Sequence, residues 1–181
     1  ACALFGYTSF AAFYIIVVWM PRYAQAFANM PESAALKTIS YYSMGSLICV
    51  FITAILVKKM VRPVWVVVLY SFIAGCTALA VYAFPSPFVC KAGSFVIGFT
   101  AAGGLLQLGV TTMNEFFSKS KALATSIVMI LSSTANFTIP MITGYLSKVN
   151  MKYIILFDVV MAFATTVIGI IMFVRFYQVF K

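Results

Sequence analysis

The sequence contains no histidine, and acidic residues are almost missing from it. Glu32, Glu115 and Asp158 are the only acids among 181 residues, whereas lysine and arginine together number 12, which gives a formal net charge of +9. Catalytic triads, carboxylate pairs and ordinary zinc sites depend on histidine or on clustered acids. The sequence therefore argues against an enzyme and against a metal site, and we expect no cofactor.

Charged residues of either sign are also scarce. They make up 8% of the sequence, while 64% of it is hydrophobic; a soluble domain has about a quarter charged residues. A nucleic-acid-binding protein clusters its basic residues on one solvated face, but here they stand between long apolar runs. This pattern is typical of membrane-protein loops, so we expect a lipid bilayer around the chain and no nucleic acid.

Six long apolar runs account for most of the chain. A helix that crosses a bilayer needs about 20 mostly apolar residues, and the runs cover approximately Ala3–Met20 (or onward past Pro21 to Phe27), Ile39–Val57, Val64–Phe84, Ala92–Phe117, Ala122–Leu146 and Tyr153–Tyr177. Membrane-spanning strands alternate in hydropathy, whereas these runs are continuously apolar. They predict an all-α integral membrane protein with six transmembrane helices.

The basic residues divide unevenly between the two sets of connections. Segments 58–63, 118–121 and 175–181 hold seven of the 12 cations, and the connections of the opposite side hold five. By the positive-inside rule we expect a multi-pass protein of the cell membrane with both termini in the cytoplasm. Because the sequence begins without Met inside an apolar run, it also looks like a piece of a longer protein.

The six runs divide into two parts of nearly equal length. The first three occupy residues 1–84, and the last three occupy residues 85–181. Two three-helix units of opposite orientation are a common construction in secondary transporters. We therefore expect two inverted three-helix repeats that together form one six-helix unit.

Four short motifs stand at the ends of these runs, in the order Trp19–Gln25, Leu56–Pro63, Asn114–Ala122 and Ile139–Leu146. In their order and spacing they resemble the C-terminal half of a major facilitator superfamily transporter, helices seven to twelve of twelve. The first and fourth resemble the proline-containing outer ends of helices seven and eleven. The third resembles the acid–aromatic turn at the inner ends of paired helices.

The basic loop departs from the family pattern in part. Lys59 and Arg62 match the family's basic residues in kind, and the resemblance implies a gating role for them. Lys58 and Val61 replace the acid and the glycine that the family usually has there. The missing acid puts the gating salt bridge of this loop in doubt.

The resemblance implies half of an alternating-access secondary transporter for a small organic solute, with an N-terminal six-helix half as its partner. It implies that the first and fourth runs line a central cavity, that the second and fifth take part in gating, and that the third and sixth lie outside. Lys91, the charge available on the cavity side, favours an organic anion. The alternative is a self-contained six-helix module that dimerises as a structural or interaction subunit.

Six residues are candidates for substrate binding: Gln107 and Thr111 in the glycine-rich fourth run, Lys91 at its outer end, Tyr7 and Tyr14 on one face of the first run, and Asn136 beside Pro140. Each has a second interpretation. Polar side chains in membrane helices also hold helices together, and a lysine near a helix end can extend to the headgroups. The sequence leaves these alternatives open.

Five residues are candidates for structural or gating roles, and Lys59 and Arg62 are two of them. Asp158 is the acid deep in an apolar run, so it needs a partner or a function. We expect a structural brace; either Lys91 is its counter-charge, or Lys91 extends outward to the headgroups. Glu115 is expected to pair with Lys119 at i+4. Pro140 frees the Asn136 carbonyl from helical hydrogen bonding, which indicates either a broken substrate-binding helix or a helix held by hydroxyl groups.

Overall fold

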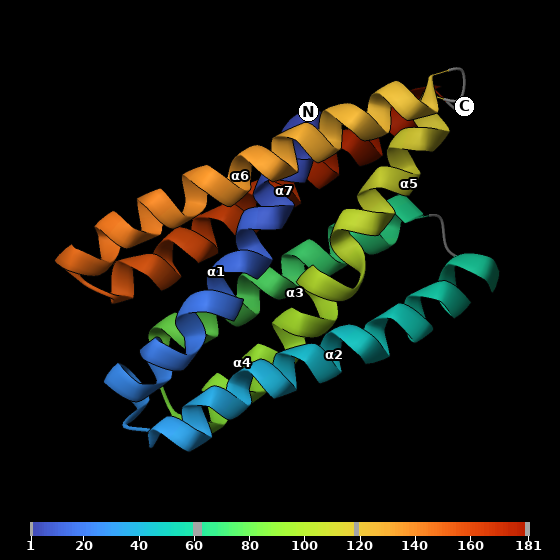
Figure 1. The fold of residues 1–181 in the computed structure, drawn as a ribbon. Helices are drawn as coiled ribbons and strands as arrows, with labels where there is room; N and C mark the ends of the chain where they lie inside the picture. The colour runs from blue at the N-terminus through green and yellow to red at the C-terminus, as the bar shows by residue number, and fades with distance from the viewer. Residues whose placement is uncertain (1, 60–62, 118–119, 180–181) are drawn as a thin grey trace.

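Helices form nearly all of the computed structural model, which describes residues 2–59, 63–117 and 120–179 (Figure 1). In chain order they are α1 (Cys2–Ala28), α2 (Glu32–Lys59), α3 (Pro63–Ala83), α4 (Pro87–Ile97), the π-helix η1 (Gly98–Leu105), α5 (Leu106–Phe116), α6 (Lys121–Val149) and α7 (Lys152–Val179). These described ranges contain no strand. The expected all-α class is confirmed.

Five of the helices are long and apolar enough to cross a membrane, namely α1, α2, α3, α6 and α7. The fourth apolar run forms α4, η1 and α5, which follow one another without a gap from Pro87 to Phe116. η1 contains three glycines within eight residues. A π-helical insertion of this kind marks a local change in the hydrogen-bond pattern of the helix.

Two helices begin earlier than hydropathy predicts. α2 starts at Glu32 instead of Ile39, because Glu32 interacts favourably with the positive end of the helix dipole although it is not apolar. α4 starts at Pro87 instead of Ala92, since Ser86 Oγ accepts a hydrogen bond from Val89 N at 3.3 Å. Caps and first turns are polar, so an apolar run does not reveal them.

The first helix continues through its proline. α1 passes Pro21 and ends at Ala28, as the longer form of the first run predicts. Asn29 then adopts a positive φ of 49°, a conformation that asparagine tolerates better than most residues, and Met30 N donates to Ala24 O at 3.2 Å. This turn reverses the chain into α2.

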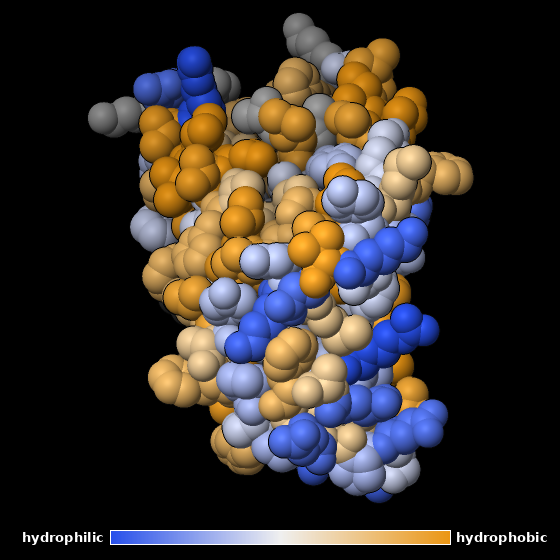
Figure 2. All heavy atoms as spheres, turned by 90° about the vertical axis from the view of Figure 1, so that its left-hand side faces the viewer, coloured by the Kyte–Doolittle hydropathy of each residue, from blue (hydrophilic) through white to orange (hydrophobic). Residues whose placement is uncertain are grey.

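Helix direction alternates along the chain, so the connections 29–31, 84–86 and 150–151 lie together at the left-hand end in Figure 1. We call this the Asn29 end. Figure 2 looks onto it and shows hydrophilic side chains gathered across the lower part of the view, with apolar side chains above. The helix bundle therefore has a polar end cap on a largely apolar body.

Two layers are visible in Figure 1. α3 and α7 pack along each other behind α1, whereas α6, α1, α5 and α2 face the viewer. The main apolar core, which includes Phe5, Tyr23, Val81 and Ile97, joins both layers. α5 and α6, which carry exposed polar side chains, both belong to the front layer in this view.

Candidate functional site

The exposed polar side chains of α5 lie along one side of that helix. Gln107 and Thr111 are exposed, and Asn114 is half-buried. Their spacing of four and three residues puts them on one helix face. Thr111 Oγ1 donates a hydrogen bond to Gln107 O at 2.9 Å, so the donor of this hydroxyl is already used within its own helix.

A matching set of polar side chains lies on α6. Ser126, Ser133 and Asn136 are all exposed, and their spacing of seven and three residues again defines one face. The two helices are joined where they converge, because Thr125 Oγ1 donates to Asn114 Oδ1 at 3.0 Å. We call Gln107, Thr111, Asn114, Ser126, Ser133 and Asn136 the α5–α6 polar face.

The remaining exposed surface of α6 is different in character. Leu123, Ile130 and Phe137 are 64%, 65% and 80% exposed, and they occupy a neighbouring stripe of the same helix. Large exposed apolar side chains suit lipid, whereas exposed polar groups at membrane depth face protein or a water-filled cavity. The α5–α6 polar face is thus the candidate site in the described part of the chain.

Three of the predicted substrate-binding residues, Gln107, Thr111 and Asn136, lie on this face. Tyr7 lies on α1, where its hydroxyl is 2.7 Å from Thr138 Oγ1 of α6. Tyr14 is half-buried and stacks on Phe10 with ring centroids 5.7 Å apart. Tyr7 is therefore joined to α6, the helix that carries Asn136, whereas Tyr14 contacts a ring of its own helix.

Lys91 is half-buried on α4 near the Asn29 end. It precedes Gln107 by 16 residues, which corresponds to roughly 24 Å along a helix at 1.5 Å per residue. The predicted ion pair between Lys91 and Asp158 is wrong for the part of the chain that the structure describes: Asp158 Oδ1 has no hydrogen-bond partner. Asp158 is 1% exposed on α7 and does not neutralise Lys91.

Of the other predicted structural or gating residues and their expected partners, some lie within the residues that the structure describes and some do not. Glu115 is exposed near the end of α5, while its expected partner Lys119 lies outside the described residues. Lys59 is the last residue of α2, and Arg62 lies outside the described residues. Pro140 is half-buried within α6, which continues beyond it to Val149.

The polar stretch before Pro140 contains one hydroxyl that joins α6 to α1 and one that is exposed, and contact of this stretch with a substrate stays a prediction. Ser132 is buried, and its Oγ donates to Gly6 O of α1 at 3.2 Å. Its neighbour Ser133 is exposed on the α5–α6 polar face. Ser133 and Ser126 were not among the predicted site residues, although their helical spacing to Asn136 could have identified them.

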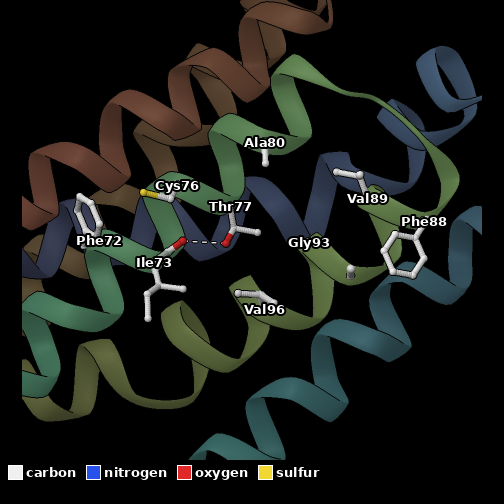
Figure 3. A pocket seen from close by; sticks show the side chains of 10 residues that line it. Phe72, Ile73, Cys76, Thr77, Ala80, Phe88, Val89, Gly93 and Val96 are labelled. Carbon is white, nitrogen blue, oxygen red and sulfur yellow. Dashed lines mark hydrogen bonds between the residues drawn. The ribbon is translucent and has the colours of Figure 1, made fainter.

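A separate pocket of about 350 Å³ lies between α3 and α4 (Figure 3). Its wall is almost entirely apolar, with Phe72, Ala80, Phe88 and Val96 among the lining residues. The hydroxyl of Thr77 already donates to Ile73 O at 2.8 Å. Polar ligand sites need a few well-placed free polar groups, so this pocket is a poor site for a polar solute.

Comparison with known proteins identifies three relatives. The chain is 60% identical over 177 residues to the inner membrane transport protein YdiN of Escherichia coli, covering 98% of this chain and 42% of that protein. It is 43% identical over 159 residues to the inner membrane transport protein YdiM of the same organism (88% of this chain, 39% of YdiM). It is 38% identical over 170 residues to the uncharacterized MFS-type transporter YfkL of Bacillus subtilis (93% of this chain, 42% of YfkL).

The chain thus spans about two fifths of the length of the curated relatives it matches. No family model matches it. No solved structure matches it. Together with the apolar helices, the relatives confirm the resemblance that the four motifs indicate: over nearly its whole length the chain is similar to membrane transport proteins, one of which is named as an MFS-type transporter.

Proposed function

We propose that the chain is the C-terminal half of an alternating-access secondary transporter, and that the α5–α6 polar face lines its solute path. The observation that supports the proposal is the exposure of Gln107, Thr111 and Asn136 on two helices of a membrane protein that are joined by the hydrogen bond between Thr125 and Asn114. Such groups are costly against lipid. They are accommodated if an N-terminal six-helix half covers this face and leaves an aqueous cavity between the halves.

The arrangement of the helices supports this assignment. The stretch α4–η1–α5 serves as a sixth span beside the five long helices, and six spans place both termini on one side of the membrane. Residues 1–84 and 85–181 would then be the two inverted three-helix repeats. The pair α3 and α7 lies behind α1 (Figure 1) and suits outer, supporting helices.

We infer that the solute is a small organic molecule with a negative charge. Lys91 is half-buried on α4, and the described part of the chain has no acid on α1, α4 or η1. A lysine in a low-dielectric cavity attracts a carboxylate strongly. Gln107, roughly 24 Å from Lys91 along the helix, would meet the solute at another point of its path, where its amide group can form hydrogen bonds.

The test is a ligand screen on the full-length protein. Organic acids and their uncharged amides are compared by thermal shift, since a ligand that binds the folded state raises its melting temperature. Compounds that stabilise the protein are then tested for counterflow in liposomes. The proposal is supported if acids but not amides stabilise the wild type and the Lys91→Met variant loses that preference. Equal effects of acids and amides would contradict the anionic solute.

The alternative is a self-contained module that dimerises and has no solute path. It predicts that residues 1–181 alone form a stable dimer in detergent, and that full-length protein shows no counterflow of any stabilising compound. The carrier predicts counterflow that requires the whole chain. Size-exclusion chromatography with light scattering, together with the liposome assay, separates the two.

A further inference from the structure

The apolar pocket between α3 and α4 has no part in the solute path proposed above, and its shape is that of a groove. Its volume is about 350 Å³, and its lining residues run from Phe72 to Ala80 on α3 and from Phe88 to Val96 on α4. Each stretch rises by roughly 12 Å at 1.5 Å per residue. The pocket therefore extends lengthwise between two neighbouring helices, and we call it the α3–α4 groove (Figure 3).

The floor of the groove is closed and its two ends are aromatic. Gly93 is buried, and a Cβ atom placed there would collide with the side chain of Val81, so α4 lies directly on α3 at this point. Phe72 and Phe88 lie at opposite ends of the groove in Figure 3, and they are 51% and 79% exposed. The groove is therefore open to the surroundings of the helix bundle.

Polar groups are scarce in the wall of the groove. Among the lining residues, Cys76 and Thr77 have a polar side-chain atom. The Thr77 hydroxyl donates to Ile73 O at 2.8 Å, and a thiol is only a weak donor and acceptor. Water is poorly held in such a space, since a buried water normally makes about three hydrogen bonds. An empty groove would lose the dispersion contacts of its lining atoms, so an apolar occupant is favoured.

The depth and direction of the groove match those of a lipid chain. α3 ends with Ala83 at the Asn29 end, and Phe72 lies roughly 16 Å before that residue along the helix. This distance is about half of the hydrocarbon thickness of a bilayer, which is about 30 Å. Membrane helices are tilted by about 20° on average from the bilayer normal. A groove between two of them therefore points along the acyl chains of one leaflet.

The exposed side chains beside the groove also suit lipid. Leu69 and Leu79 on the same side of α3 are 56% and 45% exposed. Contacts between membrane helices are enriched in small residues, whereas these side chains are large and apolar. We propose that the α3–α4 groove binds one acyl chain of a phospholipid from the leaflet at the Asn29 end. Lys91 is not among the lining residues, so the occupant is held by its chain and not by its headgroup.

Photolabelling of the full-length protein in a mild detergent tests the proposal. The protein is stripped of lipid and titrated with a phosphatidylglycerol that carries a diazirine on one acyl chain, and peptide mass spectrometry after illumination locates the label. Label on residues 72–80 and 88–96 should saturate at one lipid per chain. Label on the exposed stripe of α7 that contains Val160, Val167 and Ile171 should instead rise in proportion to the lipid content of the micelles.

Two competitors and a pair of variants identify what is bound. Unlabelled phosphatidylglycerol should displace the saturable label, whereas glycerol 3-phosphate, which has the headgroup chemistry without a chain, should not. Ala80→Phe places a ring in the groove and should abolish the saturable label. Ala83→Phe is the matched control, because Ala83 is an exposed alanine of the same helix outside the groove, and it should leave the label unchanged. Ala92→Phe fills the groove from α4 and replaces Ala80→Phe if that variant does not fold.

Three results would overturn the proposal. The first is label in the groove that rises in proportion to lipid, as on α7, or that is missing because another part of the full-length protein covers the groove. The second is displacement by glycerol 3-phosphate, which would indicate a headgroup site. The third is saturable label that persists when the groove is filled by phenylalanine. None of these measurements involves a solute, so this proposal and the proposed carrier can fail independently.

Discussion

At the scale of single residues, neighbouring hydroxyl groups on α6 have different roles. Ser132 is buried and bonds to the backbone of α1, whereas Ser133 is exposed on the α5–α6 polar face. Thr134 is exposed too and donates to Ile130 O of its own helix at 2.9 Å. A helix turns by about 100° per residue, so adjacent side chains meet different surroundings.

Ser132→Ala should lower the stability of the full-length protein by about 0.6 kcal/mol, the typical value of a hydrogen bond between membrane helices. Ser133→Ala is the matched control and should leave stability nearly unchanged, because its side chain is exposed. Thermal unfolding in detergent measures both. Equal melting temperatures for the two variants would contradict a role for Ser132 in holding α6 to α1.

Gln107→Ala should weaken solute transport while leaving the melting temperature close to that of the wild type. Loss of one hydrogen bond to the solute costs about 0.5–1.5 kcal/mol, or roughly a two- to tenfold higher half-saturating concentration. Gln178→Ala changes another exposed glutamine, near the end of α7, and should have no effect. A Gln107→Ala protein that loses stability instead of transport would show that this side chain only supports the helix.

At the scale of helices, α2 meets the α4–η1 stretch through two glycines. A Cβ atom on Gly45 would collide with the backbone of Phe95, and one on Gly98 would collide with the backbone of Tyr42. Backbone atoms cannot move aside as a flexible side chain can. These contacts hold α2 close to the start of the π-helix.

Gly45→Ala should destabilise the protein by about 1–3 kcal/mol, the usual cost of adding a methyl group to a packed contact. Gly144→Ala is the matched control in α6. No atom lies within 4 Å of a Cβ placed there, and alanine is favoured over glycine in a helix by about 1 kcal/mol. The two variants should therefore move the melting temperature in opposite directions. A Gly45→Ala protein as stable as the wild type would contradict the close contact.

At the scale of the whole molecule, the alternating helices sort the basic residues to the two ends. Arg22, Lys37 and Lys148 are exposed toward the Asn29 end, whereas the cations of segments 58–62 and 119–121 belong to the connections of the opposite end. In the sequence, segments 58–63, 118–121 and 175–181 together contain seven of the 12 cations. The positive-inside rule therefore predicts that the Asn29 end faces outward.

Cysteine labelling in intact cells tests this orientation. In a full-length protein without its natural cysteines, Asn150→Cys at the Asn29 end should react with a thiol reagent that cannot cross the membrane. Met60→Cys should react only after the cells are opened. The reverse pattern would show that the termini are outside, and labelling of both sites from outside would contradict an even number of spans.

The all-α membrane class of the protein could be predicted from its amino-acid composition and from the succession of apolar runs. Missing histidine, scarce acids and continuous apolar runs predict membrane helices without reference to any contact, because the transfer of each segment into lipid depends mainly on that segment. The positions of α3 and α7 and the passage of α1 through Pro21 were predictable for the same reason. The polar first turns of α2 and α4 were not, since caps lie outside the apolar runs.

Which side chains meet was decided by the tertiary structure. Residue counting placed Asp158 and Lys91 at similar depth and suggested an ion pair, but the partners of a side chain depend on the rotation and neighbours of its helix. Packing buried Asp158 within the bundle and left its Oδ1 unpaired. Packing likewise separated Ser132 from Ser133 and brought Asn114 to Thr125. Hydropathy is a property of one segment, whereas a site is made by several segments, and only their packing selects the residues that form it.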